Sequence, residues 1–158
     1  MMRRVRVLCL GNDLLGDDGL GQAVAGALIP LAGPGVDVVY APSAGFALLD
    51  HVTGVDHLLL IDTIRTGTAP PGTLYEFQEA DLQIPAGPSP HYIGLREVLQ
   101  LARALDLGAP EAIAVLAVEA ADCTTVGGPM HAAVRESVAA VCNRARNVIT
   151  GWMEVEHA

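Results

Sequence analysis

The sequence predicts a single α/β domain built on a mixed, mostly parallel sheet, and three observations support this prediction. The chain has 158 residues, which is enough for one domain with a substantial core and too few for two ordinary domains. About half of the residues (51%) are apolar but only 4% are aromatic, so Ala, Val, Leu and Ile must build the core. Short apolar runs alternate with helical patterns, which is typical of strands covered by helices.

Five apolar runs are predicted to be strands: Val5–Leu10, Val36–Tyr40, His57–Ile61, Thr73–Phe77 and Ala112–Val118. The third holds four consecutive aliphatic residues, as expected of a strand buried on both faces. Only residues 63–72 separate it from the fourth, which is too short for an ordinary parallel crossover. We therefore expect the fourth strand to run antiparallel at an edge, giving a mixed sheet.

Helical patterns occupy the segments between these runs. Residues 20–31 place an apolar residue on one face at Leu20, Val24, Leu28 and Leu31. Shorter helices are expected over 46–53 and 93–105. The last helix is expected over 129–149, with Pro129 in its first turn. The whole chain, 1–158, is thus predicted to form one domain, with 1–4 and 152–158 as terminal tails.

The charge and residue inventory excludes several classes of function. A net charge of −9 disfavours nucleic acid as a partner. All nine basic residues are Arg, which excludes P-loop, Schiff-base and Ser-Lys lysine chemistry. The three cysteines form no Cys-x-x-Cys pair, and no apolar run approaches the roughly 18 residues of a membrane span. With no recognisable signal peptide, these features predict a cytoplasmic protein without a membrane span.

Three polar segments fall where the predicted strands end, at 11–19, 62–63 and 89–92. In open α/β sheets ligands bind beyond the carboxyl ends of the parallel strands, so Asp18, Asp62 and His91 are candidate ligands. The sequence leaves a simpler interpretation open for each. Asp18 or its neighbour could cap the helix that follows, Asp62 could open an Asx-turn, and His91 could be a surface or capping residue.

Other chemistries fit the sequence poorly. The glycines at 19–24 are not a dinucleotide fingerprint, because Val24 stands where Gly or Ala is required. Carboxylates in this loop would also repel a pyrophosphate. No serine lies in Gly-x-Ser-x-Gly, nothing beside Cys123 would activate its thiol, and the histidines lack zincin spacing. Nucleotide binding and covalent catalysis are therefore disfavoured.

Three blocks of the sequence resemble the nickel–iron hydrogenase maturation endopeptidases: residues 10–21 with Gly16-Asp17-Asp18-Gly19, residues 56–62 ending in Asp62, and residues 89–95 with Ser89-Pro90-His91. Their order and spacing match the family, and the resemblance extends over most of the chain. The sequence departs from the family pattern at 41–45 and 119–129. The change at 41–45 affects how the substrate is held, and the change at 119–129 affects the rim of the cleft. Both leave the three candidate residues in place.

The resemblance implies a twisted, mixed five-stranded sheet with helices on both faces. It implies that Asp18, Asp62 and His91 form the metal-contacting, catalytic trio, and that Asp17 caps the first helix or supports the trio. The implied activity is removal of a C-terminal extension from a hydrogenase large-subunit precursor after nickel insertion. The nickel would belong to the precursor, and no nucleotide is involved.

Two alternatives remain open at this stage. One is a non-catalytic nickel-binding accessory protein for hydrogenase assembly that uses the same three residues. The other is a small-ligand or nucleotide module in which the acidic residues only cap helices. The sequence does not determine the oligomeric state, and a monomer is compatible with it.

Overall fold

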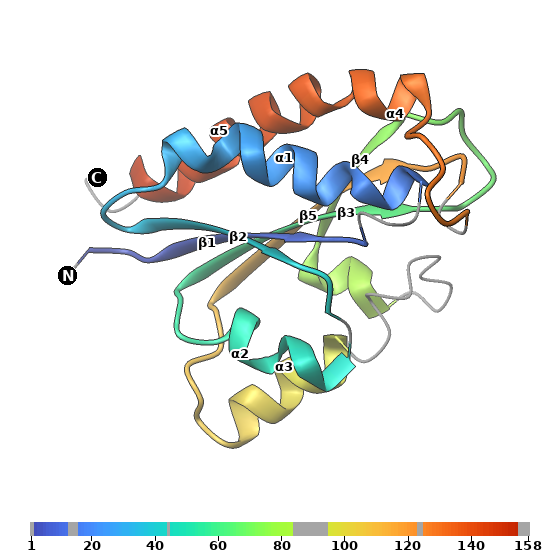
Figure 1. Ribbon diagram of the computed structural model, residues 1–158. Coiled ribbons are helices and arrows are strands. Elements are labelled where there is room, and N and C mark those ends of the chain that lie inside the picture. The colour runs from blue at the N-terminus through green and yellow to red at the C-terminus, as the bar shows by residue number, and fades with distance from the viewer. Residues whose placement is uncertain (1, 13–15, 44, 84–94, 123–124, 155–158) are drawn as a thin grey trace.

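The computed structural model describes residues 2–12, 16–43, 45–83, 95–122 and 125–154. Across these residues one five-stranded sheet lies between two layers of helices (Figure 1). Its strands are β1 (Val5–Leu10), β2 (Val36–Ala41), β3 (His57–Ile64), β4 (Leu74–Gln78) and β5 (Ala112–Glu119). The predicted α/β fold with a mixed sheet is confirmed.

The strand order is β2-β1-β3-β5-β4, and only β4 pairs antiparallel with its neighbour in the described sheet. The predicted antiparallel edge strand is therefore confirmed, and the short connection after β3 explains it. The carboxyl ends of the four parallel strands share one edge of the sheet. β3 pairs with β1 only as far as Ile61, so residues 62–64 extend beyond the paired end of β1.

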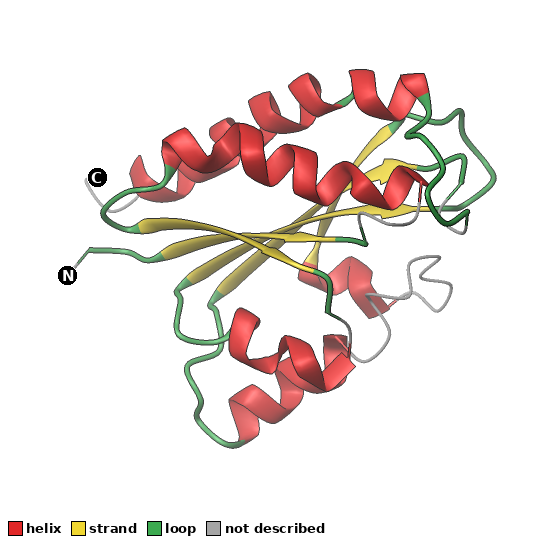
Figure 2. Ribbon diagram, in the orientation of Figure 1, coloured by secondary structure: helices red, strands yellow, loops and turns green. Residues whose placement is uncertain are grey.

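Helices α1 (Leu20–Leu28), α4 (Ala132–Glu136) and α5 (Val138–Glu154) cover one face of the sheet, and α2 (Leu49–Val52) and α3 (Leu95–Ala104) cover the other (Figure 2). Alternation along the strands supplies both cores. Leu59 and Ile61 of β3 pack toward α1 and α5, whereas Leu58 and Leu60 pack on the opposite side. The sheet is thus buried on both faces, as the aliphatic third strand predicts.

Gly21 allows α1 to lie directly on β1. A Cβ at this position would be 2.2 Å from the carbonyl oxygen of Leu10, which no side chain could tolerate. A glycine inside a helix costs roughly 0.5–1 kcal/mol relative to alanine. Here it permits the close approach that sets the position of the loop between β1 and α1.

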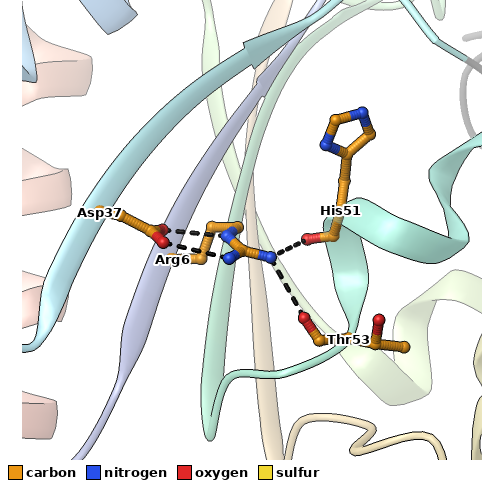
Figure 3. Close-up of polar contacts among 4 residues, drawn as sticks. All are labelled: Arg6, Asp37, His51 and Thr53. Atoms are coloured by element: carbon orange, nitrogen blue, oxygen red, sulfur yellow. Dashed lines mark hydrogen bonds and ion pairs between the residues drawn. The ribbon is translucent and has the colours of Figure 1, made fainter.

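Arg6 fastens the amino end of the sheet to α2. Its guanidinium makes a bidentate ion pair with Asp37 on β2, at 3.0 and 3.1 Å (Figure 3). Its Nη1 also donates to the carbonyl oxygens of His51 and Thr53, at 2.9 and 3.1 Å. A cation that binds carbonyls at a helix C-terminus stabilises that end, so Arg6 holds α2 against the strands.

His57 opens β3 at this same amino end, far from the strand's carboxyl end. It is buried and packs edge-on against Trp152 of α5, with ring centroids 4.9 Å apart. Burial, with the positive charge of Arg3, lowers the pKa of His57. His57 therefore serves as a packing residue between β3 and α5.

Most elements begin or end within a few residues of the sequence-based expectation, and the differences that matter are at β3 and near the C-terminus, where residues 152–154 are helical instead of part of a tail. β3 runs to Ile64, so Asp62 lies inside the strand. The last predicted helix is two helices, with His131 as the N-cap of α4, and α5 extends to Glu154. Pro129 therefore precedes the helix instead of lying in its first turn. No helix among the described residues is long and apolar enough to cross a membrane.

Candidate functional site

Asp18 lies in a short 3-10 turn, η1 (Gly16–Gly19), that leads into α1 beside the carboxyl end of β3. The side chain is buried. Its Oδ2 accepts the backbone N–H of Asn12 at 2.8 Å, and its Oδ1 accepts the Thr63 hydroxyl at 2.9 Å. No side chain of the described residues caps the start of α1, so the capping interpretation of Asp18 is wrong. Its carboxylate faces β3 instead.

Asp62 lies next to Thr63 in β3 and is fully buried. Its Oδ1 accepts the backbone N–H of Thr63 at 2.7 Å. Both residues belong to extended strand paired with β5, so the interpretation of Asp62 as the start of a turn is wrong. The structure therefore brings Asp18 to the residue adjacent to Asp62, at the edge where the sequence predicts a site.

Cys9 of β1 lies in buried surroundings near Asp62. Burial raises the pKa of Cys9 to about 12, and the neighbouring Cys142 and Asp62 raise it in the same direction. A thiol with this pKa stays protonated at neutral pH and is a poor nucleophile. Both cysteines are buried core residues, as predicted, and neither takes a part in the candidate site.

Asp17 connects the first loop to the segment that follows β5. Its Oδ2 accepts the backbone N–H groups of Ala121 and Asp122 at 2.7 and 2.8 Å, and its Oδ1 accepts that of His131 at 2.6 Å. In return its own N–H donates to the carbonyl oxygen of Asp122 at 2.8 Å. Of the two roles expected for Asp17, capping of the first helix is wrong, and these contacts fit the other, support of the residue beside it. Asp17 holds η1, and Asp18 with it, against the backbone at residues 121, 122 and 131.

Glu119 holds the loop after β3 in place through hydrogen bonds to its carboxylate. This buried carboxylate at the end of β5 accepts the hydroxyl and N–H of Thr66, the N–H of Gly67 and the Tyr75 hydroxyl. Burial alone would raise the pKa of Glu119, but the Thr66 and Tyr75 hydroxyls and the two N–H groups outweigh it and lower the pKa. Two buried carboxylates, Asp17 and Glu119, thus fasten two loops at the carboxyl edge.

The hydrogen bonds of Glu119 predict a pH dependence of stability. The pKa of Glu119 in the folded state lies below its ordinary value of 4.5. Ionised Glu119 therefore contributes fully to folding stability above pH 4.5, and this contribution is lost as the pH falls through the folded-state pKa. Glu119→Gln should lower the free energy of unfolding by about 1–3 kcal/mol at pH 7. The difference from wild type should shrink as the pH falls below 4.5. Denaturant unfolding at a series of pH values measures it.

Tyr75→Phe serves as the matched control for Glu119→Gln. It keeps the carboxylate and removes one of its donors, the hydroxyl at 2.9 Å. It should therefore lose less stability than Glu119→Gln and retain part of the pH dependence. A difference between Glu119→Gln and wild type that is the same at pH 7 and pH 3 would contradict the assignment.

The third candidate residue, His91, lies outside the described residues, as does Cys123. Among the residues that are described, no group of three His, Cys, Asp or Glu side chains is arranged to hold a metal ion. The structure therefore places two members of the predicted trio, Asp18 and Asp62, on adjoining elements, and the part played by His91 stays a prediction.

Sequence reasoning placed Thr63 and Glu119 in segments near this edge but assigned neither of them a role. Glu119 carries the same signal that singles out Asp62, an acidic residue at the end of an apolar strand, and could have been found by it. Thr63 carries no comparable signal, because a Thr in a strand is unremarkable. Its role is visible only when the fold brings Asp18 to it.

Comparison with known proteins decides the family. Residues 30–148 match the family model described as hydrogenase maturation protease, which is more than half of the chain. The chain belongs to this family. The sequence-based assignment to the hydrogenase maturation peptidases is thereby confirmed.

Curated relatives agree with the assignment. The chain is 33% identical over 106 residues to the hydrogenase 2 maturation protease of Escherichia coli strain K12, an alignment that spans 63% of each protein. It is also 28% identical over 154 residues to the hydrogenase expression/formation protein HupD of Rhizobium leguminosarum bv. viciae, covering 94% of this chain and 75% of that protein.

Solved structures show the same fold. The hydrogenase maturating endopeptidase HybD from E. coli superimposes with a TM-score of 0.80 at 23% identity, over 94% of this chain and 93% of that one. The NiFe hydrogenase maturation protease HybD from Thermococcus kodakarensis gives a TM-score of 0.74 at 27% identity, over 92% and 98% of the two chains. The family member described here thus has the architecture of these peptidases over nearly its whole length.

Proposed function

We propose that this family member is an endopeptidase that removes the C-terminal extension of a nickel–iron hydrogenase large-subunit precursor after nickel insertion. The observation that carries the proposal is the position of Asp18, hydrogen-bonded to the residue next to Asp62 at the carboxyl edge, in a chain of this family. The precursor is the proposed partner and the cytoplasm the proposed location.

In this proposal the metal is part of the substrate. Asp18 and Asp62 offer carboxylate oxygens and His91 an imidazole nitrogen, a donor set compatible with nickel. Both carboxylates are buried, and a carboxylate in a poorly hydrated site attracts a divalent cation more strongly than it would in water. A precursor that carries nickel would therefore dock at this edge, whereas an unloaded one would lack the cation that the carboxylates bind.

The residues around Asp18 and Asp62 would fix the positions of these two carboxylates. Asp17 holds η1 through three backbone N–H groups, and Glu119 holds the loop after β3. Rigid support of this kind lets a site select the productive position of its substrate without reorganising. The candidate nucleophile is water, because the described cysteines are buried, protonated thiols, and no serine of the chain lies in a nucleophile motif.

Asp62→Asn and His91→Ala test the proposal in a host that carries the cognate hydrogenase. Asn keeps the shape of Asp62 but removes its charge, so both variants should leave the large subunit at precursor mass. Processing should be slower by about 100-fold or more, because loss of a residue that only orients a metal ligand already costs roughly 10–100-fold. Asp50→Asn in α2 is the control, because Asp50 is exposed and lies away from this edge.

The mass of the large subunit distinguishes the outcomes. Normal shortening in both variants would overturn the assignment. Shortening that continues when the whole chain is deleted would instead favour an accessory protein that binds nickel without cleaving.

A further inference from the structure

The two oxygens of the Asp18 carboxylate are held by different parts of the chain. Oδ2 accepts the backbone N–H of Asn12, in the loop after β1, and Oδ1 accepts the side-chain hydroxyl of Thr63, in β3. Thr63 is 2% exposed and Asp18 is 6% exposed. A hydroxyl that donates to a carboxylate in such surroundings forms a strong, charge-assisted hydrogen bond.

This arrangement controls the rotation of the Asp18 carboxylate. The last torsion of an aspartate side chain is broad, so a single donor leaves the plane of the carboxylate loosely defined. Two donors, one to each oxygen and from different elements, fix that plane. The backbone donor from Asn12 is present whatever residue stands at position 12, except proline, whereas the donor from position 63 depends on the side chain.

Thr63 also ties Asp18 to the strand that carries Asp62. β3 pairs with β1 only through Ile61, so Asp62 and Thr63 lie past the end of that pairing, where the first loop approaches β3. Successive side chains of a strand point to opposite faces. Thr63 therefore points to the side of the sheet on which Asp18 lies, and its hydroxyl joins Asp18 to the strand that carries Asp62.

We propose that Thr63 is a positioning residue, whose hydroxyl orients the Asp18 carboxylate relative to Asp62 so that the two bind a divalent metal as a pair. The proposal rests on the function proposed above and assigns a specific side chain to it. Residues that orient a metal-binding carboxylate typically change metal affinity or activity by 10–100-fold when they are removed.

Thr63→Val and Thr63→Ser test this role. Val keeps the shape and strand preference of Thr but has no donor, whereas Ser keeps the hydroxyl. Binding of Ni²⁺ alone to the purified chain is measured by calorimetry, and KM and kcat are measured with nickel-loaded precursor. Thr63→Val should weaken Ni²⁺ binding about tenfold or more and raise KM. Thr63→Ser should restore both to within about threefold of wild type, since orientation of a metal-binding group is what such a hydroxyl supplies.

Thr73→Val is the matched control. It removes another hydroxyl that donates a hydrogen bond, to the carbonyl oxygen of Pro70 at 2.6 Å, in an exposed turn that does not contact Asp18. It should leave Ni²⁺ binding and KM unchanged.

The outcomes separate the positioning role from the proposed function. Equal Ni²⁺ affinity and equal KM in wild type and Thr63→Val would overturn the role of Thr63 while leaving the peptidase assignment in place. A Thr63→Val variant that loses folding stability but keeps its Ni²⁺ affinity would also overturn this role, because the Thr63 hydroxyl would then be purely structural. A wild-type chain that neither binds Ni²⁺ nor shortens the precursor would reject the proposed function and this inference together.

Discussion

Asp17→Ala should lower the free energy of unfolding by about 3–5 kcal/mol, because it leaves three backbone N–H groups without their acceptor. Asp17 is 1% exposed, so water cannot readily replace the lost carboxylate. Each donor then bears its own desolvation cost, which is why the expected loss exceeds that of an ordinary hydrogen bond. Denaturant unfolding followed by circular dichroism measures the change.

Two further variants show whether burial is the cause. Asp17→Asn keeps one acceptor oxygen and should lose less stability than Asp17→Ala. Asp81→Ala also removes a carboxylate that accepts a backbone N–H, that of Gln78 at 2.8 Å, but Asp81 is exposed and water can take its place. It should cost less than about 1 kcal/mol. Equal losses for Asp17→Ala and Asp81→Ala would contradict the anchoring role of Asp17.

Gly11→Ala should be the second most damaging single change at this edge, at about 2–4 kcal/mol. Gly11 follows β1 with a φ of 156°, and a Cβ there would lie 2.3 Å from the backbone carbonyl oxygen of Asp18. The added methyl group must therefore displace η1. Because Asp18 moves with η1, the variant should lose precursor processing as well as stability, and both are measured on the same preparation.

Gly26→Ala is the control for this substitution. Gly26 lies in the interior of α1, and a Cβ there would meet nothing within 4 Å. The same chemical change should therefore stabilise the protein by about 0.5–1 kcal/mol, through the better helix propensity of alanine. If Gly11→Ala were instead neutral and still processed precursor normally, the close approach of Asp18 to Gly11 would not matter to the site.

Local patterns were sufficient to predict most of the fold. The aliphatic run in β3 and the short connection to β4 each have a direct physical consequence, burial on both faces and an antiparallel edge, and both are present. The division of the last helix was not predictable in the same way. Ser137 ends α4 with its hydroxyl bonded to the carbonyl oxygen of Val134, a local choice that the apolar periodicity of the segment does not reveal.

The candidate site also has a part that local sequence patterns predict and a part that they do not. Asp62 could be singled out because it follows an apolar strand, whereas the choice of Asp18 over Asp17 rests on the family resemblance. The fold brings Asp18 to the residue next to Asp62. The partners of Asp17 could not be predicted, since they stand at 121, 122 and 131, more than 100 residues away along the chain. A capping prediction considers only local partners, and here distant backbone donors compete successfully for the carboxylate.

The most direct test of the central claim is the mass of a purified large-subunit precursor before and after incubation with the wild-type chain, in nickel-loaded and nickel-free form. The proposed function predicts that the loaded precursor loses its C-terminal extension and the nickel-free precursor does not. A loaded precursor of unchanged mass would contradict the peptidase assignment. Equal shortening of both forms would contradict metal recognition by Asp18 and Asp62.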